Sequence, residues 1–264
     1  MELPSLLLIN ALLVSGWLFL FWLMSIPLRN VAIVDIAWGM GFVLISWCSA
    51  WCTSHEGINR WLLPVLVTLW GLRLSLYLLW RNHNKPEDKR YRAMREHRGQ
   101  TFVYSSLWIV FGLQALLIWI VSLPVQFGIF HASPEWSVLH IIGVVLWLIG
   151  FLFETVGDYQ LARFLATREN NQEVMDRGLW KYTRHPNYFG DFLAWWGFYF
   201  ISLAGVAEFV WWTVIGPVIM SILLMRVSGV TLLEQTLRQS RPSYDAYCRR
   251  TSSFFPWFPR TGIE

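Results

Sequence analysis

The sequence contains few charged residues. Only 14% of its 264 residues are Asp, Glu, Lys or Arg, whereas soluble domains carry roughly 25%. Hydrophobic residues make up 55% and include 18 Trp and 18 Phe, a composition that favours an integral membrane protein. The net charge of +4 does not indicate a nucleic-acid-binding protein, because most basic residues lie in a few loops between apolar segments.

Several site patterns are also missing. The three cysteines, Cys48, Cys52 and Cys248, form neither a metal-binding pattern nor a disulfide framework. The histidines show no HExxH or comparable spacing, so we expect no metal. There is no GxGxxG and no Walker A motif, so a nucleotide site would have to be built by helices of a membrane bundle. No linker, low-complexity segment or clear repeat divides the chain, which predicts a single integral membrane domain over residues 1–264.

Long apolar segments predict an all-α transmembrane bundle. A bilayer core needs about 20 apolar residues per helix. Seven segments approach this length: 3–27, 31–52, 61–80, 102–123, 136–157, 187–206 and 209–226. We expect Pro27 and Pro124 to end the first and fourth spans, and the last two spans to form a hairpin that turns near Ala207 and Glu208.

The distribution of Lys and Arg predicts the orientation of the bundle. Loops 81–101 and 158–186 and the C-terminal tail are rich in these residues, whereas loop 124–135 has none. With seven spans the basic regions fall on one side, which the positive-inside rule makes cytoplasmic. The N-terminus is then expected outside and the C-terminus in the cytoplasm.

The most polar and aromatic stretch between two apolar segments covers residues 178–191. Pro186 is a good first residue for a helix, because its missing N–H would need no partner there. Helical spacing predicts one shared face for Arg184, Asn187 or Tyr188, and Asp191. A helix N-terminus with Lys181 nearby favours anions, so we predict a site for the phosphates of a nucleotide cofactor.

Two carboxylates are expected where the fifth span ends. Glu154 and Asp158 are four residues apart and therefore share a helical face. Ionisable groups at membrane depth are costly and commonly line a cavity or pair with each other. Both a functional cavity and an interfacial helix end paired with Arg163 or Lys181 fit this pattern.

Other candidate polar residues lie in the N-terminal spans and in the tail. Asp35 and Arg73 are expected near the cytoplasmic ends of the second and third spans, where they either neutralise each other or serve catalysis directly. Tyr77 can donate a proton from its phenol, although a transmembrane Tyr is more often an interface anchor. Tyr244 and Tyr247 are spaced to face one partner and can hydrogen-bond phosphate or amide groups; an amphipathic tail helix lying in the headgroups fits as well.

These motifs resemble the bacterial DUF1295 membrane proteins, which belong with the C-terminal domain of steroid 5-alpha-reductases and with the sterol reductases. The matching runs are Arg184 to Asp191 (Arg-His-Pro-Asn-Tyr-Phe-Gly-Asp), Tyr244 to Tyr247, Asp35 to Gly39 and Trp70 to Leu74. The resemblance implies a seven-helix bundle in the bacterial inner membrane. It places the substrate among the helices of residues 1–135 and a cytoplasm-facing NADPH pocket in residues 136–264.

The resemblance also implies the chemistry: reduction of a carbon–carbon double bond in a steroid-like or other lipid enone. The residues expected to contact NADPH are Arg73, Asp158, Gln160, Arg163, Lys181, Arg184, His185, Asn187, Tyr188, Asp191, Tyr244 and Tyr247. The candidates for polarising the substrate carbonyl are Tyr77, Asp35 and Glu154. The surplus of Arg and Lys near the motif favours NADPH over NADH. The chain departs from the family pattern at Gly157, where the family has Ser, and at Glu154, where it often has Asn.

Two other functions fit the same residues. The isoprenylcysteine carboxyl methyltransferases, which use S-adenosylmethionine, share an Arg-His-Pro-x-Tyr-x-Gly run and an acidic residue like Glu234. Asn187 and Asp191 favour the reductase over this methyltransferase. A membrane scaffold or lipid-binding protein that has kept the fold without an activity is the third interpretation.

Overall fold

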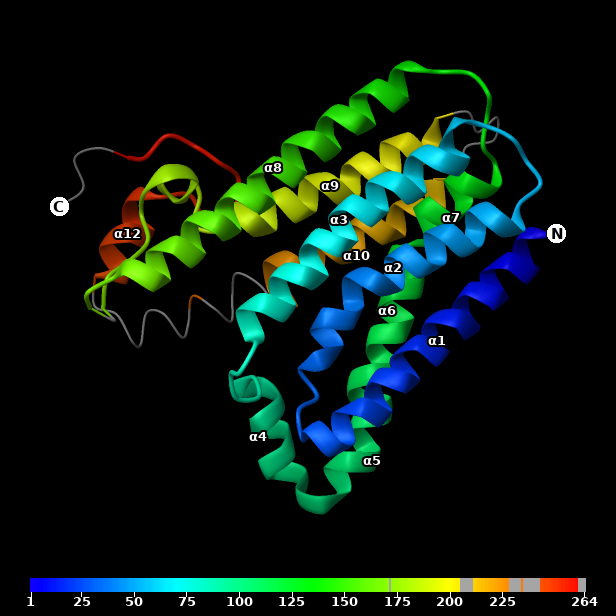
Figure 1. The fold of residues 1–264 in the computed structure, drawn as a ribbon. Coiled ribbons are helices and arrows are strands. Elements are labelled where there is room, and N and C mark those ends of the chain that lie inside the picture. The colour runs from blue at the N-terminus through cyan, green and yellow to red at the C-terminus, as the bar shows by residue number, and fades with distance from the viewer. Residues whose placement is uncertain (171, 205–210, 228–233, 235–242, 261–264) are drawn as a thin grey trace. The chain divides into compact units, whose positions relative to one another are not determined.

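Figure 1 shows a computed structural model of the chain. The structure describes residues 1–170, 172–204, 211–227, 234 and 243–260. Its regular elements in these ranges are helices, and the bridge between Thr183 and Ser252 is isolated. The all-α prediction is confirmed. The chain forms two compact units, residues 1–137 with 201–215 and residues 138–200 with 216–264. Whether both belong to one domain stays a prediction.

The first unit contains the N-terminal helices. They are α1 (Leu3–Leu28), α2 (Ile33–Cys52), α3 (Ile58–Asn82), α4 (Lys89–Arg98), the 3₁₀ turn η1 (Gly99–Thr101), α5 (Phe102–Ser106), the π-helix η2 (Leu107–Gly112), α6 (Leu113–Val121), α7 (Leu123–Phe130) and the 3₁₀ turn η4 (Trp211–Val214). The second unit is built mainly from α8 (Val138–Thr167), the 3₁₀ turn η3 (Gly178–Lys181), α9 (Pro186–Leu203), α10 (Ile215–Ile222), the π-helix η5 (Leu223–Val227) and α12 (Tyr244–Arg250).

Five helices in the described part of the chain are long and apolar enough to cross a membrane. They are α1, α2, α3, the run Lys89–Val121 and α8. The predicted sixth span corresponds to α9, with 18 residues, and the seventh to the shorter apolar run Trp211–Arg226. The chain is therefore a helical integral membrane protein. The turn predicted near Ala207 and Glu208 lies outside the described residues.

The structure corrects three predicted loops. The segment expected to be loop 124–135 contains α7, because a proline fits the first turn of a helix and Pro124 occupies that position. Loop 81–101 contains α4, whose first turn is capped by the Asp88 carboxylate, which accepts a hydrogen bond from the backbone N–H of Arg90. Helix α8 continues to Thr167, well beyond the predicted end at residue 157.

The first unit is held together by close helix packing and by buried polar contacts. Helices α2 and α3 meet at two glycines: a Cβ atom at Gly71 would lie 2.6 Å from the carbonyl oxygen of Gly39. The buried Asn10 of α1 donates hydrogen bonds of 2.9 Å to Ser49 of α2 and to Gln126 of α7. Such bonds between buried side chains tie apolar helices together inside a membrane.

The second unit is organised by the contact between α8 and α9, which run side by side in Figure 1. Three glycines of α8, Gly143, Gly150 and Gly157, follow each other at seven-residue intervals. A Cβ atom at Gly150 would lie 2.5 Å from the carbonyl oxygen of Gly190, and one at Gly197 would lie 2.7 Å from that of Gly143. Only glycines allow the two backbones to approach so closely.

Candidate functional site

The polar stretch 178–191 begins with the short turn η3, which is fastened to α8. Gly178 has a φ of +61°, and the Gln160 side chain fills the space that a Cβ atom would need there. The Gln160 amide oxygen accepts a hydrogen bond of 3.0 Å from the Leu179 N–H. The Trp180 indole N–H donates to the carbonyl oxygen of Gly157, also at 3.0 Å. These contacts fix the entry into α9 against the polar end of α8.

Arg184 lies before helix α9 and not on it. Helix α9 begins at Pro186, and a proline disfavours the helical conformation in the residue before it. The N–H of Arg184 donates instead to the carbonyl oxygen of Ser252, at 2.9 Å. The prediction that Arg184 shares a helical face with Asn187 and Asp191 is therefore wrong.

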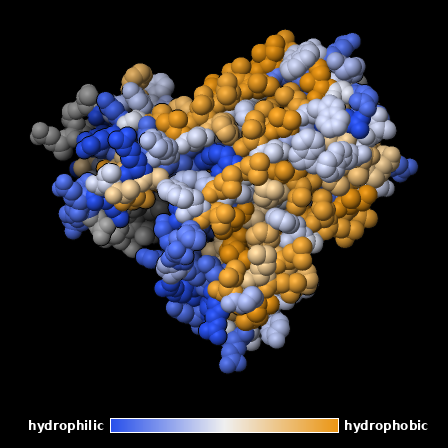
Figure 2. Space-filling view, viewed as in Figure 1, coloured by the Kyte–Doolittle hydropathy of each residue, from blue (hydrophilic) through white to orange (hydrophobic). Residues whose placement is uncertain are grey.

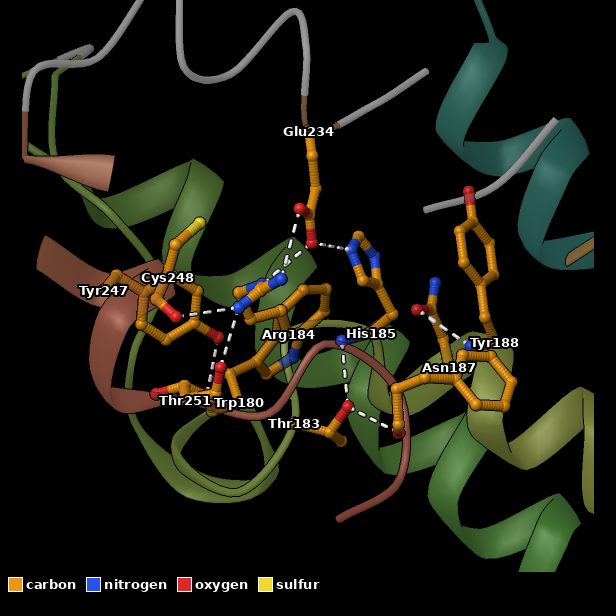
Figure 3. Close-up of polar contacts among 11 residues, drawn as sticks. Trp180, Thr183, Arg184, His185, Asn187, Tyr188, Glu234, Tyr247, Cys248 and Thr251 are labelled. Carbon is orange, nitrogen blue, oxygen red and sulfur yellow. Dashed lines mark hydrogen bonds and ion pairs between the residues drawn. The ribbon is translucent and has the colours of Figure 1, made fainter. Parts of the chain in front are cut away.

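The guanidinium of Arg184 joins the polar stretch to the C-terminal tail (Figure 3). Its Nε and Nη2 atoms bind the two carboxylate oxygens of Glu234, at 2.7 and 3.1 Å. Its Nη1 atom donates to the carbonyl oxygens of Cys248 and Thr251, at 2.9 and 2.7 Å. Arg184 is only 8% exposed, so this bidentate ion pair is buried and geometrically specific. Through these contacts Arg184 joins the polar stretch to the tail.

His185 shares the Glu234 carboxylate. Its Nε2 atom lies 3.1 Å from a Glu234 oxygen, and its ring stacks on Tyr188 with 5.5 Å between centroids. Burial lowers the pKa of His185, although the Glu234 hydrogen bond opposes this effect. Burial would raise the pKa of Glu234, but hydrogen bonds from His185 and Arg184 outweigh it and keep that pKa below its usual value. We therefore assign a neutral imidazole that donates from Nε2 to an ionised carboxylate.

The neutral form of His185 leaves its Nδ1 atom as a hydrogen-bond acceptor. This atom is buried and has no partner in the part of the chain that the structure describes. A buried polar atom without a partner is costly in an ordinary core and indicates a position where a ligand or water can bind.

Asn187 and Asp158 bring the polar ends of α9 and α8 together. The Asn187 amide nitrogen donates to the Asp158 carboxylate at 3.0 Å, and its amide oxygen accepts from the Tyr188 N–H at 3.1 Å. Asp158 is 5% exposed. Asp191 follows Asn187 by one turn of α9 and is also buried. The backbone of Glu154 packs against Gly190 of α9, and the residue is only 3% exposed.

The described part of the C-terminal tail, residues 243–260, is hydrogen-bonded to the polar stretch, and we call this segment the latch. The Tyr247 hydroxyl donates to the carbonyl oxygen of Trp180 at 2.5 Å, and the Thr183 hydroxyl donates to that of Phe254 at 2.7 Å. Tyr244 and Tyr247 are both buried, so α12 turns its tyrosines inward. Burial next to Tyr244 raises the pKa of Tyr247, which keeps the phenol protonated and donating.

Arg184 and residues of the tail line a basic cavity of about 370 Å³. Four arginines, three hydroxyl residues and two aromatic residues are among those that line it: Arg184, Arg249, Arg250, Arg260, Thr251, Ser252, Ser253, Trp257 and Phe258. Arg250 also pairs with Asp176. Guanidinium and hydroxyl groups are the donors that proteins use for phosphate.

The second unit contains most of the predicted site residues. It contains Glu154, Asp158, Gln160, Arg184, His185, Asn187, Tyr188, Asp191, Tyr244 and Tyr247. Arg163 and Lys181 belong to the same unit and are exposed. No group of three His, Cys, Asp or Glu side chains among the described residues is arranged to hold a metal ion.

The other three predicted residues belong to the first unit. The Asp35 carboxylate accepts a hydrogen bond of 3.1 Å from the Tyr91 hydroxyl of α4 and lies 3.9 Å from the Arg90 guanidinium. The Arg73 guanidinium lies over the Tyr77 ring, 5.7 Å from its centroid. A pairing of Asp35 with Arg73 and a catalytic role for Tyr77 stay predictions.

Sequence patterns do not reveal the residues that fasten Arg184. Two of its three partners are backbone carbonyls, which any residue type provides. Glu234 is recognisable only as an isolated acid in the tail. The cluster of Arg249, Arg250 and Arg260 beside two serines is the one sequence signal that points to the basic cavity.

The fold and the site define a helical integral membrane protein with a buried polar site at the start of a late helix, latched by its own tail. Residues 21–251 match the family described as "Protein of unknown function (DUF1295)". The match covers most of the chain, so the protein belongs to the DUF1295 family, as predicted. No curated protein and no solved structure matches the chain.

Proposed function

We propose that the protein is a membrane-embedded reductase that uses NADPH to reduce a carbon–carbon double bond in a steroid-like or other lipid enone. The observation that carries this proposal is the hydrogen bond between Asn187 and Asp158. It gathers an amide and a carboxylate where the polar end of α8 meets the first turn of α9. Steroid 5-alpha-reductases and sterol reductases, to which the polar stretch is similar, support the choice of reaction.

The side chains of the second unit fit the chemistry of the cofactor. A nicotinamide carries an amide that both donates and accepts hydrogen bonds, and Asn187, Asp158 and Asp191 offer both functions. Asn187 and Asp191 lie one turn apart on α9, and Asn187 is hydrogen-bonded to Asp158 of α8. The Nδ1 atom of His185 adds a buried acceptor. Ribose hydroxyls can donate to such acceptors.

The phosphates of NADPH fit the basic cavity better than the first turn of α9. Two N–H groups in that turn are already used, since Tyr188 donates to the Asn187 side chain and Phe189 donates to the His185 carbonyl. Arg249 and Arg260 are exposed in the latch and provide positive charge. Lys181 adds a further exposed cation in η3.

The reaction requires a hydride, a proton and the exclusion of water. Bound NADPH supplies the hydride. The buried Glu154 is the candidate in the second unit for a hydrogen bond to the substrate carbonyl, and Asp35 and Tyr77 are the candidates in the first. A site inside a membrane bundle excludes water and admits a lipid-soluble substrate. The basic loops support a site on the cytoplasmic side, with the N-terminus outside and the C-terminus inside. The resemblance supports a bacterial inner membrane.

The proposal is tested by NADPH binding to detergent-purified protein. We expect Asn187→Ala to weaken binding at least tenfold, because it removes the amide and its hydrogen bond to the buried Asp158 carboxylate. Arg177→Gln, an exposed position outside the site, is the matched control and should bind like the parent. Equal binding by the parent and Asn187→Ala would remove the basis of the proposal.

The Arg184–Glu234 ion pair favours a second candidate, a methyltransferase that uses S-adenosylmethionine. Methyltransferases with a similar Arg-His-Pro-x-Tyr-x-Gly run share an acidic residue in the tail. Asn187 and Asp191 support the reductase instead. Binding of S-adenosylmethionine without binding of NADPH would decide for this alternative.

A further inference from the structure

A long apolar groove runs along the first unit between α1 and the segment η2–α6. Its volume is about 990 Å³, at the upper end of the roughly 300–1,000 Å³ typical of ligand pockets. Small residues from both sides help to form it: Ala11, Gly16, Gly112 and Ala115. A Cβ atom at Gly16 would meet nothing within 4 Å, so the groove is open at this point.

Two hydrogen bonds join α1 to the neighbouring helices beyond the ends of the groove. The Trp22 indole N–H of α1 donates to the carbonyl oxygen of Val103 in α5, at 3.1 Å. At the other end the Trp119 indole N–H of α6 donates to the carbonyl oxygen of Leu7, at 2.9 Å. These bonds fasten α1 to α5 and α6 on both sides of the open stretch. The π-helix η2 lines the groove, and π-helical turns occur frequently at functional sites.

The groove has the length of one hydrocarbon chain in one leaflet. Ala11 and Phe19, which both line it, are separated by about 12 Å of helix at roughly 1.5 Å per residue. One leaflet contributes about 15 Å of hydrocarbon to a bilayer core. Tyr104 and Trp108, each 75% exposed, lie toward the Trp22 end. Exposed aromatic residues of this kind anchor at the level of the headgroups.

The charged residues that lie beyond the two ends of the groove differ in sign. Arg29 caps the end of α1, and Arg98 ends α4 shortly before α5 begins; both are exposed. Arg95 of α4 binds Glu87, which also accepts a hydrogen bond of 2.8 Å from the Val31 N–H. This contact fastens α4 beside the turn that follows α1. Glu2 precedes α1 at the opposite end.

We propose that this groove is a binding site for an anionic phospholipid, with one acyl chain between α1 and η2–α6 and the phosphate at Arg29 and Arg98. The chain-length groove fits a single acyl chain, and the basic residues beyond it lie where a headgroup would reach water. Figure 2 shows hydrophilic residues gathered over α4, next to the hydrophobic surface of α1. None of the residues that line the groove is among those proposed to bind NADPH.

The test measures lipid retained by the detergent-purified full chain in native mass spectrometry, with phosphatidylglycerol and phosphatidylcholine of the same chain length. We expect the parent to retain phosphatidylglycerol at least tenfold better. Gly16→Leu fills the groove at its open point and should reduce the retention of both lipids at least tenfold. The double variant Arg29→Gln/Arg98→Gln should lower phosphatidylglycerol to the level of phosphatidylcholine.

Matched controls separate the site from general effects of bulk and charge. Leu76→Phe adds bulk at an exposed apolar position of α3, and Arg177→Gln removes an exposed cation of the second unit; both should retain lipid like the parent. Equal retention by the parent and Gly16→Leu would overturn the groove assignment. Equal retention of the two lipids by the parent, or a double variant that behaves like the parent, would overturn the anionic headgroup site. The double variant decides this even if Gly16→Leu does not fold.

Discussion

Arg184 is the residue on which the candidate site depends most. One guanidinium binds Glu234, Cys248 and Thr251, and so fixes the tail against the start of α9. We expect Arg184→Ala to destabilise the docking of the tail by about 3–5 kcal/mol, because it leaves the Glu234 carboxylate buried without its cation. Limited proteolysis of residues 243–260 is the measurement.

Glu234→Gln is the comparison for this prediction. It keeps a hydrogen-bond acceptor for Arg184 and should loosen the tail less than Arg184→Ala. Tail cleavage at the parental rate in Arg184→Ala would show that the ion pair does not hold the latch.

The His185–Glu234 contact predicts a loss of stability in acid. The pKa of His185 lies below its usual 6.5, so below about pH 6.5 the unfolded chain binds a proton that the folded chain does not. The pKa of Glu234 lies below its usual 4.5, which adds a further loss below about pH 4.5. Both pKa shifts therefore make the fold less stable in acid than at neutral pH. Thermal unfolding between pH 7.5 and 5.5 should show a falling midpoint, and His185→Gln should show a smaller fall; a parent with a constant midpoint would contradict this assignment.

Sequence analysis identifies the composition of the site better than its connections. The helical spacing of Glu154 and Asp158 and the run from Asn187 to Asp191 predict polar groups on α8 and α9, and the structure places these groups in one unit. It does not predict that Arg184 precedes α9, because spacing alone does not determine where a helix begins. Nor does it predict the backbone carbonyl partners of Arg184, because every residue type has a carbonyl group.

At the scale of elements, glycine packing between α8 and α9 controls the geometry of the site. A Cβ atom at Gly190 would lie 2.5 Å from the carbonyl oxygen of Gly150, so the helices would have to separate. We expect Gly190→Ala to destabilise the protein by more than about 2 kcal/mol, as overpacking does. Gly16→Ala has open space and should be neutral or stabilising by up to about 1 kcal/mol.

Thermal unfolding of these two variants in detergent is the measurement. A midpoint for Gly190→Ala equal to that of Gly16→Ala would show that α8 and α9 are not as closely packed as the structure indicates.

The positions of most helices follow from apolar length, but two short helices do not. Helix α7 begins beside Pro124, in a segment without charges. A proline is equally compatible with the end of one helix and with the first turn of the next. Helix α4 is strongly polar, and Tyr91 is its only buried residue. The seven-residue interval of Gly143, Gly150 and Gly157 is a signal in the sequence for the α8–α9 contact.

At the scale of the whole molecule, the charge distribution predicts the orientation of the bundle. Cysteines introduced at Arg98 and Ser253, both exposed, should react with a membrane-impermeant maleimide only after the cell is opened, because these positions are predicted to be cytoplasmic. A cysteine at exposed Glu2 should react in intact cells. Labelling of Ser253→Cys in intact cells would reverse the orientation.

The class of the protein follows from its long apolar segments, because a helix satisfies its own backbone hydrogen bonds inside a membrane. The relation between the two units does not follow, because packing between helices in a membrane rests on small shape differences and not on hydrophobicity. Asp35, Arg73 and Tyr77 belong to the first unit, and their roles at the proposed site stay predictions.

The most direct test of the proposed reductase is a calorimetric titration of the detergent-purified protein with NADPH and, separately, with S-adenosylmethionine. The site around Asn187, Asp158 and the basic cavity predicts binding of NADPH and none of S-adenosylmethionine. It also predicts weaker binding of NADH, which lacks the extra phosphate. Binding of S-adenosylmethionine alone, or of neither compound, would contradict the proposed function.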